Sequence, residues 1–210
     1  MLGKRFEGSI ESTGSGEIMT PPDEAVVMLD VLTEADTAAE AVAANAKLTQ
    51  AVIDAVMEEP NQGVTTTGLG VFPVYQYDRQ TNVSTIIGFR ASNGVRVVTR
   101  PSAAGQVYDA GIQAGANVSS GISYRIKNEA PLREEALRLA VKQAFAEAQV
   151  VADTAGVELL GARTIVIDPI GGPIVLRAER MAADAAPTPV IPEDLRVRAS
   201  VRITFRTRVG

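Results

Sequence analysis

Apolar and polar side chains alternate over residues 195–209, with Thr207 as the one polar side chain at an apolar position. Most of the polar positions are arginines, so an extended strand here has one apolar face and one basic face. The arginines are Arg196, Arg198, Arg202, Arg206 and Arg208. At roughly 3.3 Å per residue the strand is about 50 Å long. A compact chain of this size is only about 40–45 Å across, so we expect the strand to cross the whole molecule, with length left over to project from it.

Three other stretches follow the helical period. Residues 38–56 carry apolar side chains three and four positions apart, and a turn sequence at residues 60–63 ends the run. Residues 131–155 form a continuous alanine-rich stripe, and Gly156 follows where helices often end in a left-handed residue. A shorter helix is predicted over residues 102–114. The chain is therefore expected to contain two long helices and one short one.

The remaining apolar runs predict strands, which alternate with the helices. They cover residues 10–18, 25–32, 64–77, 83–100, 118–126 and 157–167. The order strand, helix, strand, strand then occurs twice, over residues 25–100 and again over residues 118–209. We therefore predict an α/β fold of the α+β type, in which two βαββ-like halves with long antiparallel strands are linked by the short helix. Residues 1–22 are read as a leader with an edge strand, residues 23–209 as a single domain, and residues 174–193 as a long mobile loop.

Cysteine and histidine are both absent from the 210 residues. Their absence excludes disulfides, thiol nucleophiles, Ser-His-Asp triads and zinc sites with Cys or His ligands. We therefore predict no catalytic residues, no cofactor, no metal and no enzymatic activity, although a hard-cation site of Asp and Glu oxygens, without EF-hand spacing, stays open. With 4% aromatic residues and no tryptophan, the core must rest on Ala, Val, Leu and Ile. No apolar run approaches the roughly 20 residues of a membrane-spanning helix.

The net charge of −5 is unevenly distributed. Residues 1–60 carry 12 acidic and 3 basic side chains, whereas residues 163–210 carry 5 acidic and 8 basic ones. The basic residues alternate along a strand instead of clustering, and the isoelectric point is near 4.9, so nucleic-acid binding is not expected and membrane-surface contact is disfavoured. The arginine face then has two interpretations. It is a solvated outer face, or a seam where arginines meet the acidic N-terminal region of a neighbouring chain.

Two tyrosines are further candidates for an interface. Tyr75 and Tyr77 lie with Phe72 near a predicted hairpin, where they would anchor a loop or a subunit contact. The glycine pairs of residues 14–16 and 68–70 lack a Walker lysine or a dinucleotide fingerprint, so we interpret them as turns or bulges.

Several short stretches, taken in order, resemble the SIMPL-domain family, which includes bacterial periplasmic immunogenic and oxidative-stress-defence proteins. The matching pieces are Gly14-Ser15-Gly16-Glu17, Pro22-Asp23-Glu24-Ala25, Thr37-Ala38-Ala39-Glu40-Ala41, Gly88-Phe89-Arg90-Ala91-Ser92-Asn93, Gly115-Ala116-Asn117, Gly121-Ile122-Ser123-Tyr124, Ala155-Gly156-Val157, Thr188-Pro189-Val190 and the final strand. The resemblance implies an α/β domain that is usually exported and often oligomeric, and it supplies no catalytic motif.

Long strands leave edges that must be covered, and copies of the same chain are the simplest cover. The first hypothesis is a non-enzymatic, self-assembling structural protein of the SIMPL type, a symmetric ring or larger shell linked to envelope or oxidative-stress defence. The alternative is a binding module that holds a small or anionic ligand on a sheet face or in the lumen of an oligomer. The resemblance implies a periplasmic location. The first eight residues lack the apolar centre of a signal peptide, so either the chain stays in the cytoplasm or its signal is not part of this sequence.

Overall fold

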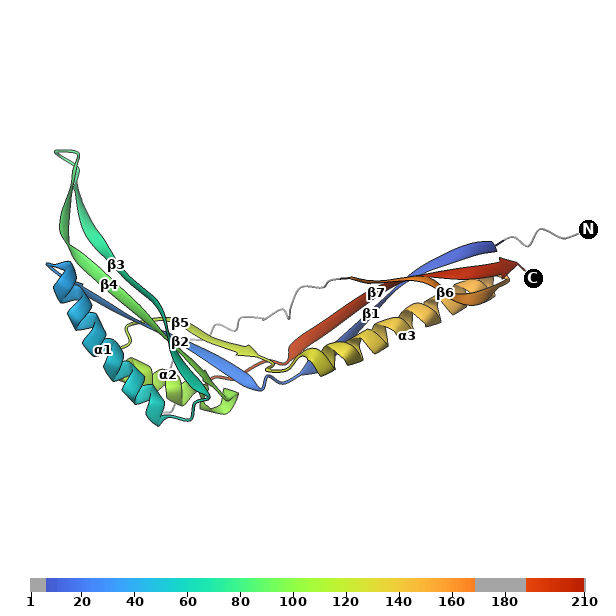
Figure 1. Ribbon diagram of the computed structural model, residues 1–210, viewed down its shortest axis with the longest axis horizontal. Coiled ribbons are helices and arrows are strands. Elements are labelled where there is room, and N and C mark those ends of the chain that lie inside the picture. Colours follow the sequence, from blue (N-terminus) through green and yellow to red (C-terminus); the bar gives the residue numbers. More distant parts are fainter. Residues whose placement is uncertain (1–6, 169–187, 210) are drawn as a thin grey trace, which may run out of the picture. The chain divides into compact units, whose positions relative to one another are not determined.

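The computed structural model describes residues 7–168 and 188–209, and the chain divides into two compact units (Figure 1). The three-stranded unit contains β1 (Glu7–Thr20), α3 (Ala130–Ala155), β6 (Val157–Asp168) and β7 (Leu195–Val209). The four-stranded unit contains β2 (Glu24–Ala35), α1 (Ala38–Glu58), β3 (Gly63–Asp78), β4 (Val83–Thr99), a 3₁₀ turn (Pro101–Ala103), α2 (Ala104–Gln113) and β5 (Val118–Arg125). All strand pairs are antiparallel. The predicted α+β class is therefore confirmed.

The strand predicted from the arginine alternation has the predicted bounds. Buried and less buried side chains alternate along β7, and its apolar side chains from Leu195 to Phe205 are almost fully buried. The helix predicted from the alanine stripe is also present, and Gly156 ends it with a φ of 68°. The predicted loop over residues 174–193 lies mostly outside the described residues, and residues 188–194 form neither helix nor strand.

The strand pairing differs from the two predicted halves, because each sheet takes a strand from outside its half. The sheet orders are β1-β7-β6 and β3-β4-β2-β5. Thus β5, which was predicted to open the second half, pairs with β2, whereas β1 pairs with β7 over its whole length. β2 and β7 are the most buried strands of their sheets. A buried strand needs hydrogen-bonding partners along both of its edges. β5 supplies the second partner of β2, and β1 supplies that of β7.

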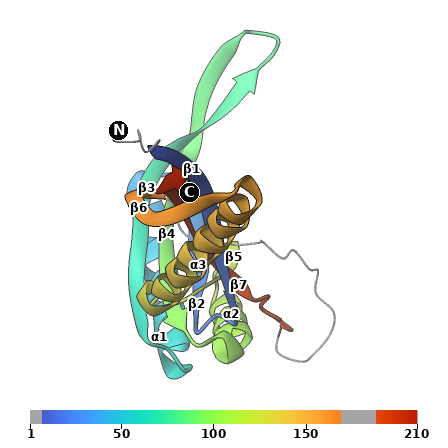
Figure 2. The same cartoon turned by 90° about the vertical axis from the view of Figure 1, so that its right-hand side faces the viewer.

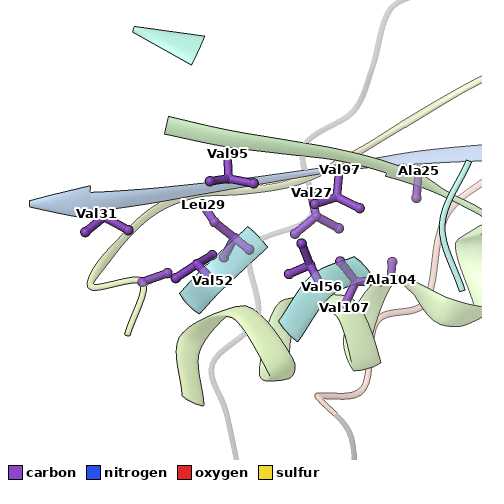
Figure 3. Packing of buried hydrophobic residues seen from close by; sticks show 11 residues of the cluster. Ala25, Val27, Leu29, Val31, Val52, Val56, Val95, Val97, Ala104 and Val107 are labelled. Atoms are coloured by element: carbon purple, nitrogen blue, oxygen red, sulfur yellow. The ribbon is translucent and has the colours of Figure 1, made fainter. Parts of the chain in front are cut away.

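Small aliphatic side chains make the core of the four-stranded unit (Figure 3). Side chains of β2 and β4, among them Val27, Leu29 and Val95, point toward Val52 and Val56 of α1. All five are fully buried. This composition agrees with a core that rests on Ala, Val and Leu because aromatic residues are scarce.

In the three-stranded unit, the backbone of α3 lies directly against the backbone of β1. The buried face of α3 is a ridge of alanines four residues apart: Ala136, Ala140, Ala144, Ala148 and Ala152. A Cβ atom added to Gly14 would stand 1.9 Å from the carbonyl oxygen of Ala140, and one added to Gly16 would stand 2.0 Å from that of Ala136. Only glycine allows this approach, so the two glycines fix the helix over the β1 side of the sheet.

The hairpin of β3 and β4 extends beyond the rest of the four-stranded unit (Figure 2). β2 ends at Ala35, which pairs with Phe89 of β4. Past that pair the sheet has only two strands, and we call residues 74–88 the ribbon. The register of β3 and β4 shifts twice, between Thr67 and Gly70 and at Val74. The first shift places Gly68, with a φ of 70°, in a bulge, as the sequence predicted for this glycine pair.

Candidate functional site

The five predicted arginines lie on one face of the three-stranded sheet, opposite α3. Cross-strand partners of β7 share its faces, so the acidic side chains of the flanking strands lie on the same surface. Arg198 Nε donates to Glu17 Oε2 at 2.6 Å, and Arg196 Nε lies 3.8 Å from Glu17 Oε1. Arg202 lies 3.8 Å from Glu11, and Arg208 pairs with Glu158. Arg206 has no ion pair among the described residues, and its neighbours across the sheet are Ser9 and Gly161.

The acidic N-terminal residues predicted to meet these arginines are thus found in the same chain. Four of the five arginines pair with three carboxylates of the same chain, which offsets much of the positive charge on this face and weakens its attraction for an anionic partner. The paired side chains are also about half exposed, between 36% and 62%. The arrangement suits the solvated-face interpretation, and a seam between chains at the arginines stays a prediction.

The ribbon carries the largest group of exposed apolar side chains among the described residues. Tyr75 and Tyr77 are each 58% exposed, Ile86 is 50% exposed and Ile87 is 54% exposed. Tyr75 pairs with Ile86 across the two strands, and Tyr77 pairs with Ser84. Because the two tyrosines are two positions apart on β3, they lie on one face of the ribbon. This face continues the side of β3 and β4 that packs on α1 in the body of the unit. The alternation that builds a core thus persists where no helix covers it.

The strands of the ribbon carry no charge before Asp78, the last residue of β3. Between Val71 and Tyr77, and between Val83 and Phe89, every side chain is apolar, aromatic or neutral and polar. The charged residues of the ribbon are Asp78 and the adjacent Arg79 of the loop, and Asp78 accepts a hydrogen bond from the backbone N–H of Gln80 at 2.8 Å. Hydrogen bonds from Gln80 and Thr81 lower the pKa of Asp78. The hydroxyl of Tyr77 donates to Asn82 Oδ1 at 2.8 Å across the same loop, so Tyr77 anchors the loop while its ring stays exposed.

A groove of about 470 Å³ lies on the other unit, between α3 and the β6 side of the sheet. Leu137 and Val141 of α3 and Ile165 and Ile167 of β6 form its apolar surface. Arg138 and Lys142 lie at its rim. The groove exists because α3 is held close to β1, which leaves the helix-facing side chains of β6 without cover. Its apolar lining suits the apolar part of a small ligand.

Two kinds of site are not found in the described ranges. Residues 7–168 and 188–209 contain no group of three or more Asp or Glu side chains placed to hold a metal ion. The helices of the same ranges all fall short of the length or the apolar character that a membrane span requires.

The sequence model of the SIMPL family, described as a protein of unknown function (DUF541), matches residues 10–205. The chain is also 30% identical over 213 residues to the 26 kDa periplasmic immunogenic proteins of Brucella melitensis biotype 1 and Brucella abortus strain S19. Each alignment covers 95% of this chain and 84% of the relative. The chain therefore belongs to the SIMPL family. The family description names no enzymatic activity.

The sequence names the arginines and the tyrosines as interface candidates, and these stay predictions; it did not predict the groove. The one feature of the sequence that could have indicated the groove is the apolar run Ile165-Val166-Ile167, which departs from strict alternation. Such a run usually marks a strand covered on both faces. In β6 all three side chains are instead 46–55% exposed. The position of α3, which depends on the glycines of β1, explains why Ile165 and Ile167 have no cover, whereas Val166 lies on the opposite face of the sheet.

Proposed function

We propose that this SIMPL-family chain is a structural protein without enzymatic activity that assembles with copies of itself through the ribbon. The observation that carries the proposal is a two-stranded segment with exposed aromatic and aliphatic side chains and no charge in either strand before Asp78 at the end of β3. An isolated two-stranded hairpin is marginally stable in water. The edge strands of monomeric proteins are usually protected by charges or prolines. Between residues 74 and 88 the only charged residues are Asp78 and Arg79, which lie at the turn of the hairpin.

A second copy of the chain is the occupant that best fits this surface. Past Phe89, no other strand of residues 7–168 and 188–209 takes the place of β2 beside β4, so its outer edge offers backbone groups for pairing. Another ribbon supplies the same free edges and the same uncharged side chains, so pairing satisfies both partners at once. Repetition of one contact under closed symmetry gives a ring or a larger shell. Because four of the five arginines of β7 already pair with carboxylates of the same chain, we assign the arginine face a smaller part in assembly.

The proposed location rests on the relatives, and the proposed wider role rests on the resemblance to the SIMPL family. Both Brucella proteins are named periplasmic and immunogenic, and we propose that this chain also works in the periplasm, in envelope or oxidative-stress defence. The alternative function, a binding module for a small ligand, is favoured by the apolar groove beside β6.

Paired substitutions on the two faces of the ribbon test the assembly. Tyr75→Lys with Ile86→Lys places two charges on the apolar face at one cross-strand pair. Gln76→Lys with Thr85→Lys places the same two charges on the opposite face at the adjacent pair. Light scattering after size-exclusion chromatography then gives the mass of each protein. We expect a multiple of the chain mass for the wild type and for the Gln76/Thr85 variant, and a smaller mass for the Tyr75/Ile86 variant.

Two results would refute the proposal. One is a monomeric wild type at micromolar concentration, and the other is an unchanged mass for the Tyr75/Ile86 variant. Arg198→Glu with Arg202→Glu tests the arginine seam separately, because loss of assembly in this variant alone would move the interface to the arginine face.

A further inference from the structure

The groove beside β6 combines an apolar floor with a basic rim. Ile165 and Ile167 are 53% and 55% exposed although they point to the side of the sheet that α3 covers elsewhere. Leu137 and Val141 border them from the helix. Exposed aliphatic side chains that converge on one groove suit the hydrocarbon part of a ligand.

The position of α3 keeps the groove open. Shifting the helix toward β6 would cover the two isoleucines, but it would break the backbone contact at Gly14 and Gly16. It would also pull the buried alanines, Ala140 among them, away from β1 and β7. The groove is therefore a built feature of the helix–sheet packing, and the nine residues of α3 from Glu134 to Lys142 give it a length of about 12 Å.

The rim carries more positive than negative charge. Arg138 pairs with Glu134 one turn earlier on α3. Lys142 lies one turn after Arg138 on the same side of the helix and has no ion pair among the described residues. An ammonium group beside an apolar groove attracts an anion at the end of an apolar chain, since the two parts of such a molecule match the two parts of the site.

We propose that this groove binds a single-chain amphiphile with an anionic head group, such as a fatty acid. The hydrocarbon chain lies along Ile165, Ile167, Leu137 and Val141, and the carboxylate lies at Lys142 with Arg138 beside it. The site does not require self-assembly, because all of its residues belong to one unit of one chain.

Titration with short-chain amphiphiles below their critical micelle concentrations tests the proposal. Calorimetry on the purified full chain compares octanoate, decanoate and decyltrimethylammonium. We expect decanoate to bind more tightly than octanoate, by about two- to fourfold per added methylene. We expect the cationic amphiphile of the same chain length to bind more weakly than decanoate, and added salt to weaken decanoate binding.

Three variants locate the site. Ile167→Ser removes part of the groove surface and should weaken decanoate binding by about fivefold or more. Val166→Ser is the matched control, because Val166 is 46% exposed on the opposite face of the same strand and should leave binding unchanged. Lys142→Glu should weaken decanoate binding by roughly two- to fivefold and strengthen binding of the cationic amphiphile.

The proposal is overturned if decanoate does not bind, if it binds no better than the cationic amphiphile, or if Val166→Ser and Ile167→Ser weaken it equally. Measuring the mass of each variant separates this site from the ribbon. If Ile167→Ser reduces the mass of the assembly and decanoate does not bind, the groove is a contact between copies and the ligand proposal fails. Decanoate binding that survives in a monomeric ribbon variant supports the groove even if the assembly proposal fails.

Discussion

Gly14 of β1 lies so close to α3 that a Cβ at this position would stand 1.9 Å from the carbonyl oxygen of Ala140. The obstacle is helix backbone, which no side-chain rotation can move aside. Gly14→Ala should therefore lower the free energy of unfolding by about 3 kcal/mol or more, measured by urea denaturation. Gly8→Ala is the control, since its Cβ would meet only the side-chain oxygen of Thr207 at 2.9 Å. Equal losses in the two variants would contradict the backbone contact.

The ion pair of Arg198 with Glu17 predicts a charge-swap effect within one chain. Arg198→Glu brings two carboxylates together and should cost about 1 kcal/mol of unfolding free energy, a typical value for a half-exposed pair. Adding Glu17→Arg should restore most of the loss, and high salt should reduce both effects. Arg206→Glu serves as the control, because no ion pair to Arg206 is seen in the described part of the chain. Failure of the double variant to recover would mean that the pair does not form in solution.

Asn45 of α1 is buried and ties the helix to two strands. Its Nδ2 donates to the carbonyl oxygens of Val31 at 2.8 Å and Ala91 at 3.2 Å. Asn45→Leu keeps the branched shape of the side chain but leaves these carbonyls without the donor, so we expect a loss of about 2–4 kcal/mol in urea denaturation. An unchanged midpoint would show that water or another donor satisfies the same carbonyls.

Tyr124 of β5 predicts a pH dependence. Its hydroxyl oxygen is buried without a hydrogen-bond partner among the described residues, and burial raises the pKa of this phenol above 10. The folded state then holds the proton more tightly than the unfolded state, so this contribution to stability is full below pH 10 and is lost as the pH rises through the folded value. Tyr124→Phe should match or exceed the wild type at neutral pH by up to about 1 kcal/mol. The advantage should grow above pH 10, and a constant difference would contradict the buried hydroxyl.

Local patterns predicted the elements well because their causes are local. The arginine alternation gave β7, and the alanine stripe with Gly156 gave α3, since strand and helix periods are visible in the sequence itself. The pairing of β5 with β2 and of β1 with β7 was not predicted. Which strand lies beside each buried strand depends on which edges stay buried in three dimensions.

Exposure was even less visible in the sequence. The alternation through Tyr75 and Tyr77 resembles that of a half-buried strand, and only the end of β2 at Ala35 shows that nothing in the unit continues beside it. The groove likewise depends on the tertiary contact of Gly14 with α3.

Removing the ribbon tests the central claim most directly. Replacing residues 74–88 by Asn-Gly closes the hairpin between Pro73 and Phe89, which already pair across the strands. Native mass spectrometry of the wild type and the shortened chain then compares their assembly states, and circular dichroism confirms that the shortened chain is folded. We predict a discrete multiple of the chain mass for the wild type and a folded monomer for the shortened chain. A shortened chain that assembles as the wild type does, or a wild type that stays monomeric, would contradict assembly through the ribbon.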